Sequence, residues 1–321
     1  TANKFNIGFT KLGHFVQTVD DKFFLKSNFS NTISDLNDKI ISNVENFAPD
    51  LILLGHTNKI TSETLKKIRN LLPKIVICRW YIDSVSPEFF TNNSKILLNN
   101  INLIDKLFIT SHPNKALSKY KNKFHFIPNP VDLSVETNKN FLRNSLDYDF
   151  FFALSHGQHR GVLKIGKKDE RDNFIEYLYK NLHQVKKFFI STSFNSPKWG
   201  SEFFYYLSNS RMGLNMSRGN YQNLYSSDRI SSLVGNGLLT FMDKKSNYQK
   251  FFTDKEIIFY KNKIDLIKKI LFYKKNDALA KKYAKNAYQK YHKHFNSKEV
   301  CSYILAESNL IKRRKFYWLT R

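Results

Sequence analysis

Short apolar runs alternate with amphipathic stretches along the first 130 residues of the chain. The apolar runs have the length of buried strands, and the stretches between them space Ile, Leu and Val at helical intervals. Strands are predicted at residues 5–9, 51–55, 75–80, 107–110 and 124–127, and helices at 31–46 and 61–72. This alternation is typical of βαβ units, so it predicts a parallel sheet with helices on its faces.

The same alternation begins again after a polar stretch at residues 132–146. Strands are predicted at residues 148–154, 187–190, 212–216, 238–241 and 257–260, and helices at 169–182, 230–235, 263–274, 277–294 and 297–311. We therefore predict an α/β protein with two Rossmann-like, doubly wound domains. The predicted parts are a first domain at residues 1–133, a linker at 134–147, a second domain at 148–305 and a basic aromatic tail at 306–321.

The composition excludes several classes of protein. Hydrophobic residues make up 41% of the 321 residues and aromatic residues 15%, which excludes a disordered chain. Cys78 and Cys301 lie far apart and match no metal-binding spacing, so we expect no disulfide and a reducing compartment. No apolar stretch is long enough to span a membrane, and the first residues lack the features of a signal peptide. We expect a cytoplasmic protein.

The charge points to a polyanionic partner. The chain has 52 Lys and Arg against 27 Asp and Glu, a net charge of +25, and residues 261–321 contain 17 basic and 4 acidic residues. Nucleotide bias in the genome is an alternative explanation of the overall excess, although it explains the clustering at one end less well. A nucleic-acid-binding protein is disfavoured, because no helix-turn-helix, zinc-finger, RRM or OB signature is present and the aromatic residues fall in predicted core elements.

Small and basic residues follow the predicted strands of the second domain, where open α/β sheets bind their ligands. Glycine lets backbone amides approach an anion, Arg and Lys neutralise phosphate, and an Asp can accept a ribose or sugar hydroxyl. The donor-binding candidates are His156, Gly157, Arg160, Lys164, Arg171, Ser217, Arg218, Ser226, Ser227, Asp228, Arg229, Asn236 and Gly237. Ordinary helix capping and turn formation are the alternative explanation for each loop on its own.

Three loops of the first domain contain candidates for acid–base chemistry. Asp83 follows the strand at 75–80 as a candidate general base or nucleophile, and His112 follows the strand at 107–110 as its partner or as a contact for the donor phosphate. Gly13 and His14 lie in the first loop, on the side expected to bind the acceptor. The alternatives are a turn before Pro87 for Asp83 and a helix start for His112.

The stretch from Met212 to Ile304 resembles the carboxyl-terminal domain of GT-B glycosyltransferases of the family-4-like, spore-coat and lipopolysaccharide-type branch. The features that carry the resemblance are Asn215-Met216-Ser217, Asp228-Arg229, Gly235-Asn236-Gly237-Leu238-Leu239-Thr240, Phe251-Phe252, Glu256-Ile257-Ile258-Phe259-Tyr260 and His294-Phe295. Ile127-Pro128-Asn129-Pro130-Val131-Asp132 is similar to the segment that closes the first domain in such enzymes. One departure is Ser226-Ser227-Asp228-Arg229, which stands where many relatives have a glutamate.

The resemblance implies two Rossmann-like domains facing a cleft, with a nucleotide-sugar on the second domain and a glycan or glycolipid acceptor on the first. It implies transfer of a sugar to a bacterial surface glycan such as lipopolysaccharide, O-antigen or capsule. Asp83 and Ser111-His112 also resemble transferases that take the acidic sugar Kdo from CMP, which we keep as a subsidiary hypothesis. The alternative functions are a non-catalytic GT-B scaffold and a basic nucleic-acid-binding protein.

Neither a metal nor another cofactor is expected. Asp20-Asp21 and Asp147-Tyr148-Asp149 are the nearest approaches to a DxD site, and both have structural explanations as a loop and a strand start. Enzymes of the resembled fold stabilise the leaving group with basic side chains and helix N-termini. The tail at residues 311–321 mixes four consecutive basic residues with three aromatic ones, which predicts either an anionic membrane contact at the inner face of the cytoplasmic membrane or packing on the first domain.

Overall fold

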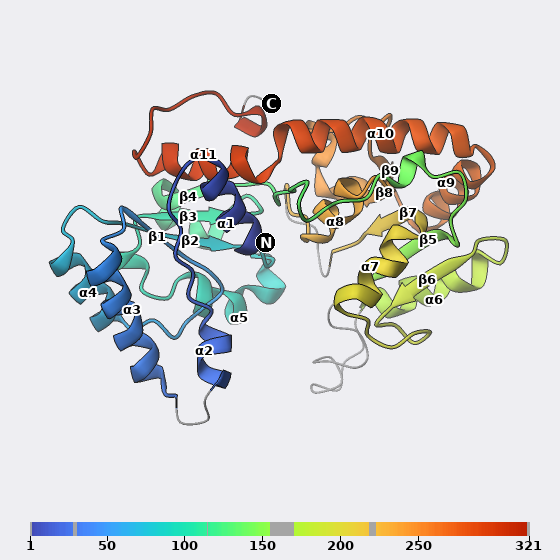
Figure 1. Ribbon diagram of the computed structural model, residues 1–321. Coiled ribbons are helices and arrows are strands. Elements are labelled where there is room, and N and C mark those ends of the chain that lie inside the picture. The colour runs from blue at the N-terminus through green and yellow to red at the C-terminus, as the bar shows by residue number, and fades with distance from the viewer. Residues whose placement is uncertain (1, 28–30, 114, 155–169, 218–222, 320–321) are drawn as a thin grey trace. The chain divides into compact units, whose positions relative to one another are not determined.

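The computed structural model describes residues 2–27, 31–113, 115–154, 170–217 and 223–319 (Figure 1). The chain divides into two compact units, and the division does not follow the chain order. The first unit consists of Thr1–Pro128 and Ser297–Thr320, and the second contains Asn129–Asn296. Each unit has its own sheet of parallel strands, in the order β1-β2-β3-β4 in the first and β6-β5-β7-β8-β9 in the second. The predicted α/β class with two doubly wound sheets is confirmed.

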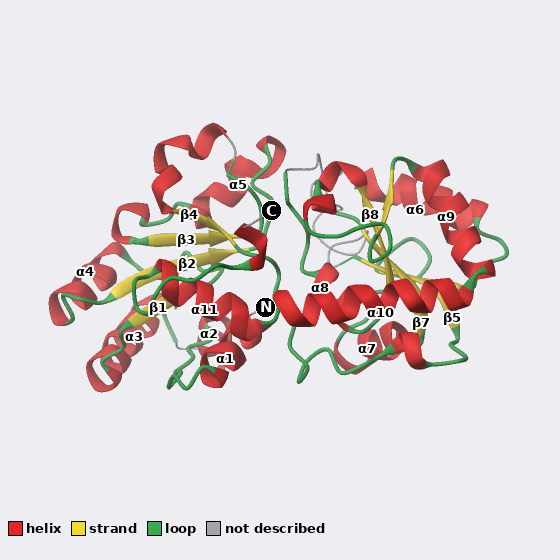
Figure 2. Ribbon diagram, turned by 90° about the horizontal axis from the view of Figure 1, so that it is seen from above, coloured by secondary structure: helices red, strands yellow, loops and turns green. Residues whose placement is uncertain are grey.

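The first unit has its strands where the apolar runs predict them. They are β1 (Leu51–Leu54), β2 (Val76–Tyr81), β3 (Lys106–Ile109) and β4 (Phe124–Phe126). The helices are α1 (Ala2–Lys11), α2 (Asp21–Ser27), α3 (Ile33–Phe47), α4 (Ser62–Leu71), α5 (Pro87–Leu97) and α11 (Ser297–Glu307), with 3-10 turns η1 (Ile101–Leu103), η2 (Lys115–Lys123) and η7 (Tyr317–Leu319). Helices α1 and α11 lie on one side of this sheet, with α3 and α4 on the other (Figures 1 and 2).

Alternating side chains of β2 explain why both faces of this sheet are covered. Ile77 and Tyr81 belong to the core on the α3 and α4 side, whereas Trp80 packs against Phe5 of α1, with ring centroids 5.3 Å apart. Arg79 is 1% exposed, and its Nη1 donates to the carbonyl oxygens of Ile96, Leu97 and Asn99 at the end of α5. A buried guanidinium therefore lies against the carbonyl oxygens at and just beyond the carboxyl end of the helix, where its positive charge is favoured.

The predicted strand at residues 5–9 is wrong, because this segment lies within helix α1. Its buried residues are Lys4, Phe5, Gly8 and Phe9, which recur at helical rather than alternating intervals. Helix α1 packs closely on α11: a Cβ at Gly8 would lie 2.5 Å from both the Ser297 carbonyl oxygen and the Cys301 sulfur. Gly13, at φ 87°, then ends the turn that follows the helix.

The two cysteines are free thiols, as predicted. Cys78 on β2 and Cys301 on α11 are both buried. Burial raises the pKa of the Cys78 thiol to about 12, so this group stays protonated at neutral pH.

The second unit is built on β5 (Tyr148–Ala153), β6 (Lys187–Ile190), β7 (Ser210–Asn215), β8 (Leu239–Asp243) and β9 (Ile258–Tyr260). Its helices are α6 (Glu170–Asn181), α7 (Gly200–Ser208), α8 (Arg229–Gly235), α9 (Lys263–Lys275) and α10 (Asp277–His294), with 3-10 turns η3 (Asn140–Leu142), η5 (Lys244–Ser246) and η6 (Tyr248–Lys250). Phe150 and Phe152 face the large cluster that includes residues of α6, α9 and α10, while Phe151 faces the cluster with α7 and α8. Strand β5 is therefore buried on both faces.

The segment predicted as a polar linker at residues 134–147 packs tightly on the second unit. Asn140 is fully buried, and its side-chain amide donates to the carbonyl oxygens of Leu207 and Ser210. Arg211 on β7 in turn donates to the Asn140 carbonyl oxygen. Because these bonds fix the segment, the junction between the units lies at Pro128 rather than in the expected linker.

Residues 297–320 belong to the first unit, which differs from the predicted end of the second domain at residue 305. Phe316 and Trp318 are 2% and 3% exposed and pack against Tyr303 of α11, with ring centroids 5.0 Å and 5.5 Å away. Phe316 and Trp318 are thus core residues and Tyr317 is half-buried, whereas the basic residues 312–315 and Leu319 are exposed. Of the two interpretations of the tail, the structure favours packing for its aromatic part. No helix among the described residues has the length and hydropathy to cross a membrane.

Candidate active site

Residues at the carboxyl ends of β5 and β7 form a connected polar cluster in the second unit. Asn215, the last residue of β7, donates from its side-chain amide to Ser226 Oγ at 2.8 Å and accepts from Ser227 Oγ at 3.1 Å. The Ser227 backbone N–H points to Ser217 Oγ at 3.4 Å. The loop before α8 is therefore held against the end of β7, as the position after a strand predicts.

Arg229 joins the ends of the two strands. Its Nε donates to the Ala153 carbonyl oxygen at 2.7 Å, and its Nη1 donates to the Met216 carbonyl oxygen at 3.0 Å and to Ser227 Oγ at 3.1 Å. The guanidinium lies 5.1 Å from the centroid of the Phe152 ring. Arg229, predicted to bind the nucleotide-sugar, donates these hydrogen bonds to oxygen atoms of the protein and so holds the two strand ends and the loop before α8 together.

Asp228 is the member of the cluster that meets solvent. It is the N-cap residue of α8, its side chain makes no capping hydrogen bond, and the residue is exposed, whereas Ser226 is fully buried. Ser226 is also held from behind, because Asn129 donates to its carbonyl oxygen at 2.9 Å. In the segment 224–228, Asp228 and the half-buried Ser227 are thus the residues that a ligand can reach.

Two layers of tertiary contact support this loop. Tyr291 of α10 donates its hydroxyl to the Asn129 carbonyl oxygen at 2.9 Å, behind the Asn129 bond to Ser226. Burial raises the pKa of the Tyr291 phenol well above its usual value, so it remains a neutral donor. Asn129 and Tyr291 were not predicted as supporting residues, because a hydrogen bond between residues far apart in the sequence leaves no pattern in the sequence around either of them.

Asn236 and Gly237 lie at the other end of α8 from Asp228. The Asn236 side chain accepts from both the backbone and the side-chain nitrogen of Asn138, at 3.1 Å and 3.2 Å. Gly237 has a φ of 76°, and a Cβ there would lie 2.6 Å from the Phe141 ring. The structure therefore gives these two predicted donor-binding residues a packing role and does not bring them to the cluster.

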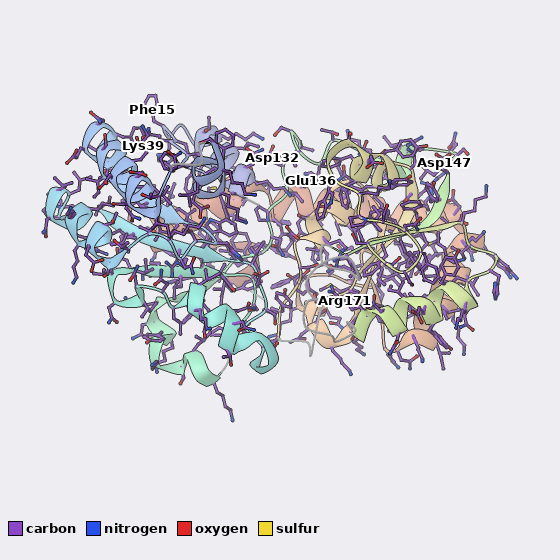
Figure 3. The ribbon with its side chains drawn as sticks, turned by 90° about the horizontal axis from the view of Figure 1, so that it is seen from below. Phe15, Lys39, Asp132, Glu136, Asp147 and Arg171 are labelled. Carbon is purple, nitrogen blue, oxygen red and sulfur yellow. The ribbon has the colours of Figure 1, made fainter. Side chains whose placement is uncertain are left out.

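The structure describes only some of the remaining residues that were predicted to bind the nucleotide-sugar. Arg171 is buried in the first turn of α6 and is labelled in Figure 3. Other predicted donor contacts lie outside the described residues, namely His156, Gly157, Arg160, Lys164 and Arg218. Among the described side chains no group of His, Cys, Asp and Glu has the arrangement of a metal site.

The first unit presents Asp83 just beyond the end of β2. Its side chain is 57% exposed, and its carboxylate Oδ2 lies 3.5 Å from Nδ1 of His56. His56 follows β1, and its ring stacks on Tyr81 at a centroid distance of 4.4 Å. The predicted position of Asp83 at the carboxyl edge of the sheet is thus found, but the sequence analysis did not select His56. His56 lies just beyond the end of β1, so the position after a strand, which led to Asp83, also points to His56.

His112 lies beyond the end of β3, the strand next to β2. The residue is exposed, and its ring is parallel to that of Phe126 at a centroid distance of 6.1 Å. Thr110 ties the two strand ends together, because its hydroxyl donates to the Ile82 carbonyl oxygen at 3.2 Å. Asp83 and His112 therefore belong to the same edge of one sheet.

Gly13 and His14 follow a helix instead of a strand. The His14 backbone N–H donates to the Phe9 carbonyl oxygen at 3.1 Å, and its ring meets the Phe9 ring edge-on. This is the capping geometry of a helix end. Gly13 and His14 therefore do not follow a strand, which was the reason for predicting them as acceptor contacts.

Comparison with known proteins gives the activity class. Residues 170–306, which include the cluster around Asp228, match the family described as Glycosyl transferase-like. No curated protein sequence matches the chain.

Solved structures of similar fold include HepE and two enzymes named as synthases of sugar phosphates. HepE from Anabaena, solved in complex with UDP, has a TM-score of 0.57 at 12% identity, over 86% of this chain and 82% of HepE. A UDP-forming α,α-trehalose-phosphate synthase from Burkholderia xenovorans has a TM-score of 0.53 at 10% identity, over 97% and 86% of the two chains. Sucrose-phosphate synthase from Thermosynechococcus elongatus has a TM-score of 0.51 at 12% identity, over 90% and 79%.

Identities this low bear on the fold alone, whereas the match over residues 170–306 bears on the chemistry. The solved structures agree with the architecture of two parallel α/β sheets that the structure shows. Together, the family match and the solved structures identify the chain as a glycosyltransferase with the GT-B fold.

Proposed function

We propose that this enzyme transfers a sugar from a nucleotide-activated donor to a bacterial surface glycan, such as lipopolysaccharide, O-antigen or capsule. The observation that carries the proposal is that the Glycosyl transferase-like match covers the part of the second unit with the exposed Asp228. Asp228 accepts hydrogen bonds from hydroxyl groups of the donor. Arg171 and the basic residues predicted around it neutralise the donor phosphates.

The donor is a nucleotide-activated sugar, and a sugar linked to UDP is the first candidate. HepE was solved with UDP and also with UDP-glucose, and the trehalose-phosphate synthase is named as UDP-forming. CMP-linked Kdo is the second candidate, on account of Asp83 and Ser111-His112.

Asp83 acts on the acceptor bound to the first unit. As a general base, its carboxylate takes the proton of the acceptor hydroxyl while the acceptor oxygen bonds to the anomeric carbon and the bond to the donor phosphate breaks. The free nucleotide leaves with the electron pair of that bond. Alternatively, Asp83 acts as the nucleophile: its carboxylate bonds to the anomeric carbon as the nucleotide leaves, and the acceptor oxygen then displaces the carboxylate, which takes up the acceptor proton. His112, on the next strand, binds the acceptor or the donor phosphate.

A nucleotide panel tests the donor part of the proposal. We expect one of UDP, GDP, ADP, TDP, CDP and CMP to raise the unfolding temperature, because a ligand at about 100 times its Kd stabilises the folded state by about 2.7 kcal/mol. We expect the same shift with EDTA as with magnesium. A shift with CMP alone supports the Kdo-type donor. No shift with any nucleotide, together with salt-dependent binding of an oligonucleotide, would favour a nucleic-acid-binding protein instead.

We further propose that the enzyme works at an anionic membrane surface through the basic residues 312–315. All four are exposed, while the neighbouring Phe316 and Trp318 are buried. The contact is therefore electrostatic and does not insert aromatic rings. Arg313 and Arg314 also pair with Glu307 and Glu299, at 3.2 Å and 2.9 Å.

Lys312 and Lys315 are the residues to replace in a test of this contact. Each basic residue near an anionic surface contributes about 1 kcal/mol, so Lys312→Gln with Lys315→Gln is expected to weaken vesicle binding about thirtyfold. The measurement is co-sedimentation with phosphatidylglycerol vesicles. The pair Lys66→Gln and Lys67→Gln on α4, also exposed, changes the charge equally and is the control. Equal effects of the two pairs would show a general charge effect and contradict a defined contact.

A further inference from the structure

His56 has a fixed protonation pattern that its neighbours impose. The backbone N–H of Ile82 donates to His56 Nε2 at 3.1 Å. A nitrogen that accepts this bond carries no proton, so the proton of the neutral ring is on Nδ1. Nδ1 is the nitrogen that lies 3.5 Å from the Asp83 carboxylate. The ring thus presents an N–H to Asp83.

The ring is also fixed in orientation. It lies parallel to the Tyr81 ring, with an angle of 9° between the planes, and against the Trp80 ring at a centroid distance of 5.4 Å. Gly55, the residue before His56, brings its backbone close to Trp80, since a Cβ there would lie 3.2 Å from the indole. Two aromatic rings therefore limit the rotation of the imidazole and hold Nδ1 toward Asp83.

The backbone on both sides of Asp83 is held independently of its side chain. Ile82 is bonded through its N–H to His56 and through its carbonyl oxygen to Thr110. The carbonyl oxygen of Ser84 accepts from the Asn93 side chain at 2.6 Å. The main freedom left at this position is the rotation of the exposed carboxylate, and His56 is the group placed to restrict it.

We propose that His56 is a positioning residue that orients the Asp83 carboxylate through its Nδ1–H. The inference rests on the proposed function, because it takes Asp83 as the acid–base or nucleophilic group. His56 takes up no proton in the reaction: its Nε2 is engaged by the backbone, and its Nδ1 already carries a proton. A carboxylate held by one N–H keeps its other oxygen for the acceptor hydroxyl.

The first test reads the tautomer directly and needs no substrate. Long-range proton–nitrogen NMR spectra of the full chain, labelled with nitrogen-15, distinguish a protonated ring nitrogen from an accepting one. His56 is assigned by the signal that His56→Gln removes. We expect a neutral ring with a protonated Nδ1 and an accepting Nε2 at neutral pH. The opposite tautomer, or a ring that exchanges between the two, would overturn the proposal.

The second test separates orientation of Asp83 from support of the loop. His56→Asn places an amide nitrogen near the position of Nδ1 and loses the acceptor for Ile82, whereas His56→Gln can reach the Ile82 N–H but not Asp83. We expect His56→Gln to lower kcat by about tenfold to a hundredfold with an unchanged KM for the donor, and His56→Asn to recover most of it. Higher activity in His56→Gln than in His56→Asn would assign His56 to the loop alone.

Failure of the proposed function is distinguishable from failure of this inference. If the unmodified enzyme consumes none of a panel of nucleotide-sugars, the proposed function fails, and the NMR result still decides the tautomer of His56. If Asp83→Asn leaves turnover unchanged, the proposed role of Asp83 fails. If Asp83→Asn abolishes turnover but both His56 variants retain it, the positioning role is overturned.

Discussion

Asp83→Asn is expected to lower sugar transfer by about a hundredfold to ten-thousandfold, the range for loss of a general acid or base. The substitution keeps the shape of the side chain but removes the carboxylate as a base or nucleophile. Because the side chain is 57% exposed and the flanking backbone is held by other residues, we expect an unchanged unfolding temperature. The measurements are initial rates of nucleotide release and thermal unfolding of the same preparation.

Asp105→Asn is the matched control in the same unit. Asp105 precedes β3, pairs with Arg69 at 2.8 Å and accepts the Ile77 backbone N–H at 2.8 Å. Replacing the Asp105 carboxylate by an amide is expected to lower the free energy of unfolding by about 1–2 kcal/mol. The rate of sugar transfer by the folded enzyme is expected to stay unchanged. Nearly full activity of Asp83→Asn would exclude Asp83 from the chemistry.

Two adjacent residues of the second unit are expected to give opposite results. Arg229→Met removes the donors to the carbonyl oxygens of Ala153 and Met216, so we expect the free energy of unfolding to fall by about 2–3 kcal/mol. Asp228→Asn removes an exposed charge without a capping bond, so we expect unchanged stability and about tenfold weaker binding of the nucleotide-sugar.

Urea unfolding and isothermal titration of the donor measure the two effects. Met is a suitable replacement because it keeps much of the length of Arg beside the Phe152 ring. If Arg229→Met were as stable as the unmodified protein and failed to bind the donor, Arg229 would be a ligand residue, as the sequence analysis expected. If Asp228→Asn bound the donor normally, the donor contact would lie elsewhere.

The sheets could be predicted because their strands are buried on both faces. A run such as Phe150-Phe151-Phe152 has apolar residues on successive positions, which suits a central parallel strand. The same criterion failed at residues 5–9, which lie in helix α1, where Phe5 and Phe9 are buried and Phe5 packs against Trp80 of the sheet. Over so short an apolar segment, the two periodicities can hardly be told apart.

The prediction of a linker failed, and the two interpretations of the tail stayed open, for a related reason. Polar residues such as Asn140 are typical of loops, yet Asn140 is buried because its amide satisfies the ends of α7 and β7. Phe316 and Trp318 were compatible with a membrane interface until their contacts with Tyr303 were known. The residue type shows which environments a side chain can occupy, and the tertiary structure determines which of them it occupies.

In the candidate site, position after a strand placed Asp83 at the exposed carboxyl edge of its sheet. Asp228, Asn236 and Gly237 were all selected from the segment that follows the strand at 212–216. Asp228 is exposed, whereas Asn236 and Gly237 pack against the segment at 138–141. A glycine-containing turn binds phosphate only where it lies at the ligand edge of the sheet, which its composition does not reveal.

Donor consumption tests the central claim most directly. The enzyme is incubated with UDP-glucose, other nucleotide-sugars and CMP-Kdo without an acceptor, so that water takes the place of the acceptor hydroxyl. Free nucleotide and free sugar are then measured by chromatography. We predict slow release from one class of donor, equal with magnesium and with EDTA, and its loss in Asp83→Asn. Release from no donor, by a protein that no nucleotide stabilises, would contradict the assignment of a nucleotide-sugar-dependent transferase.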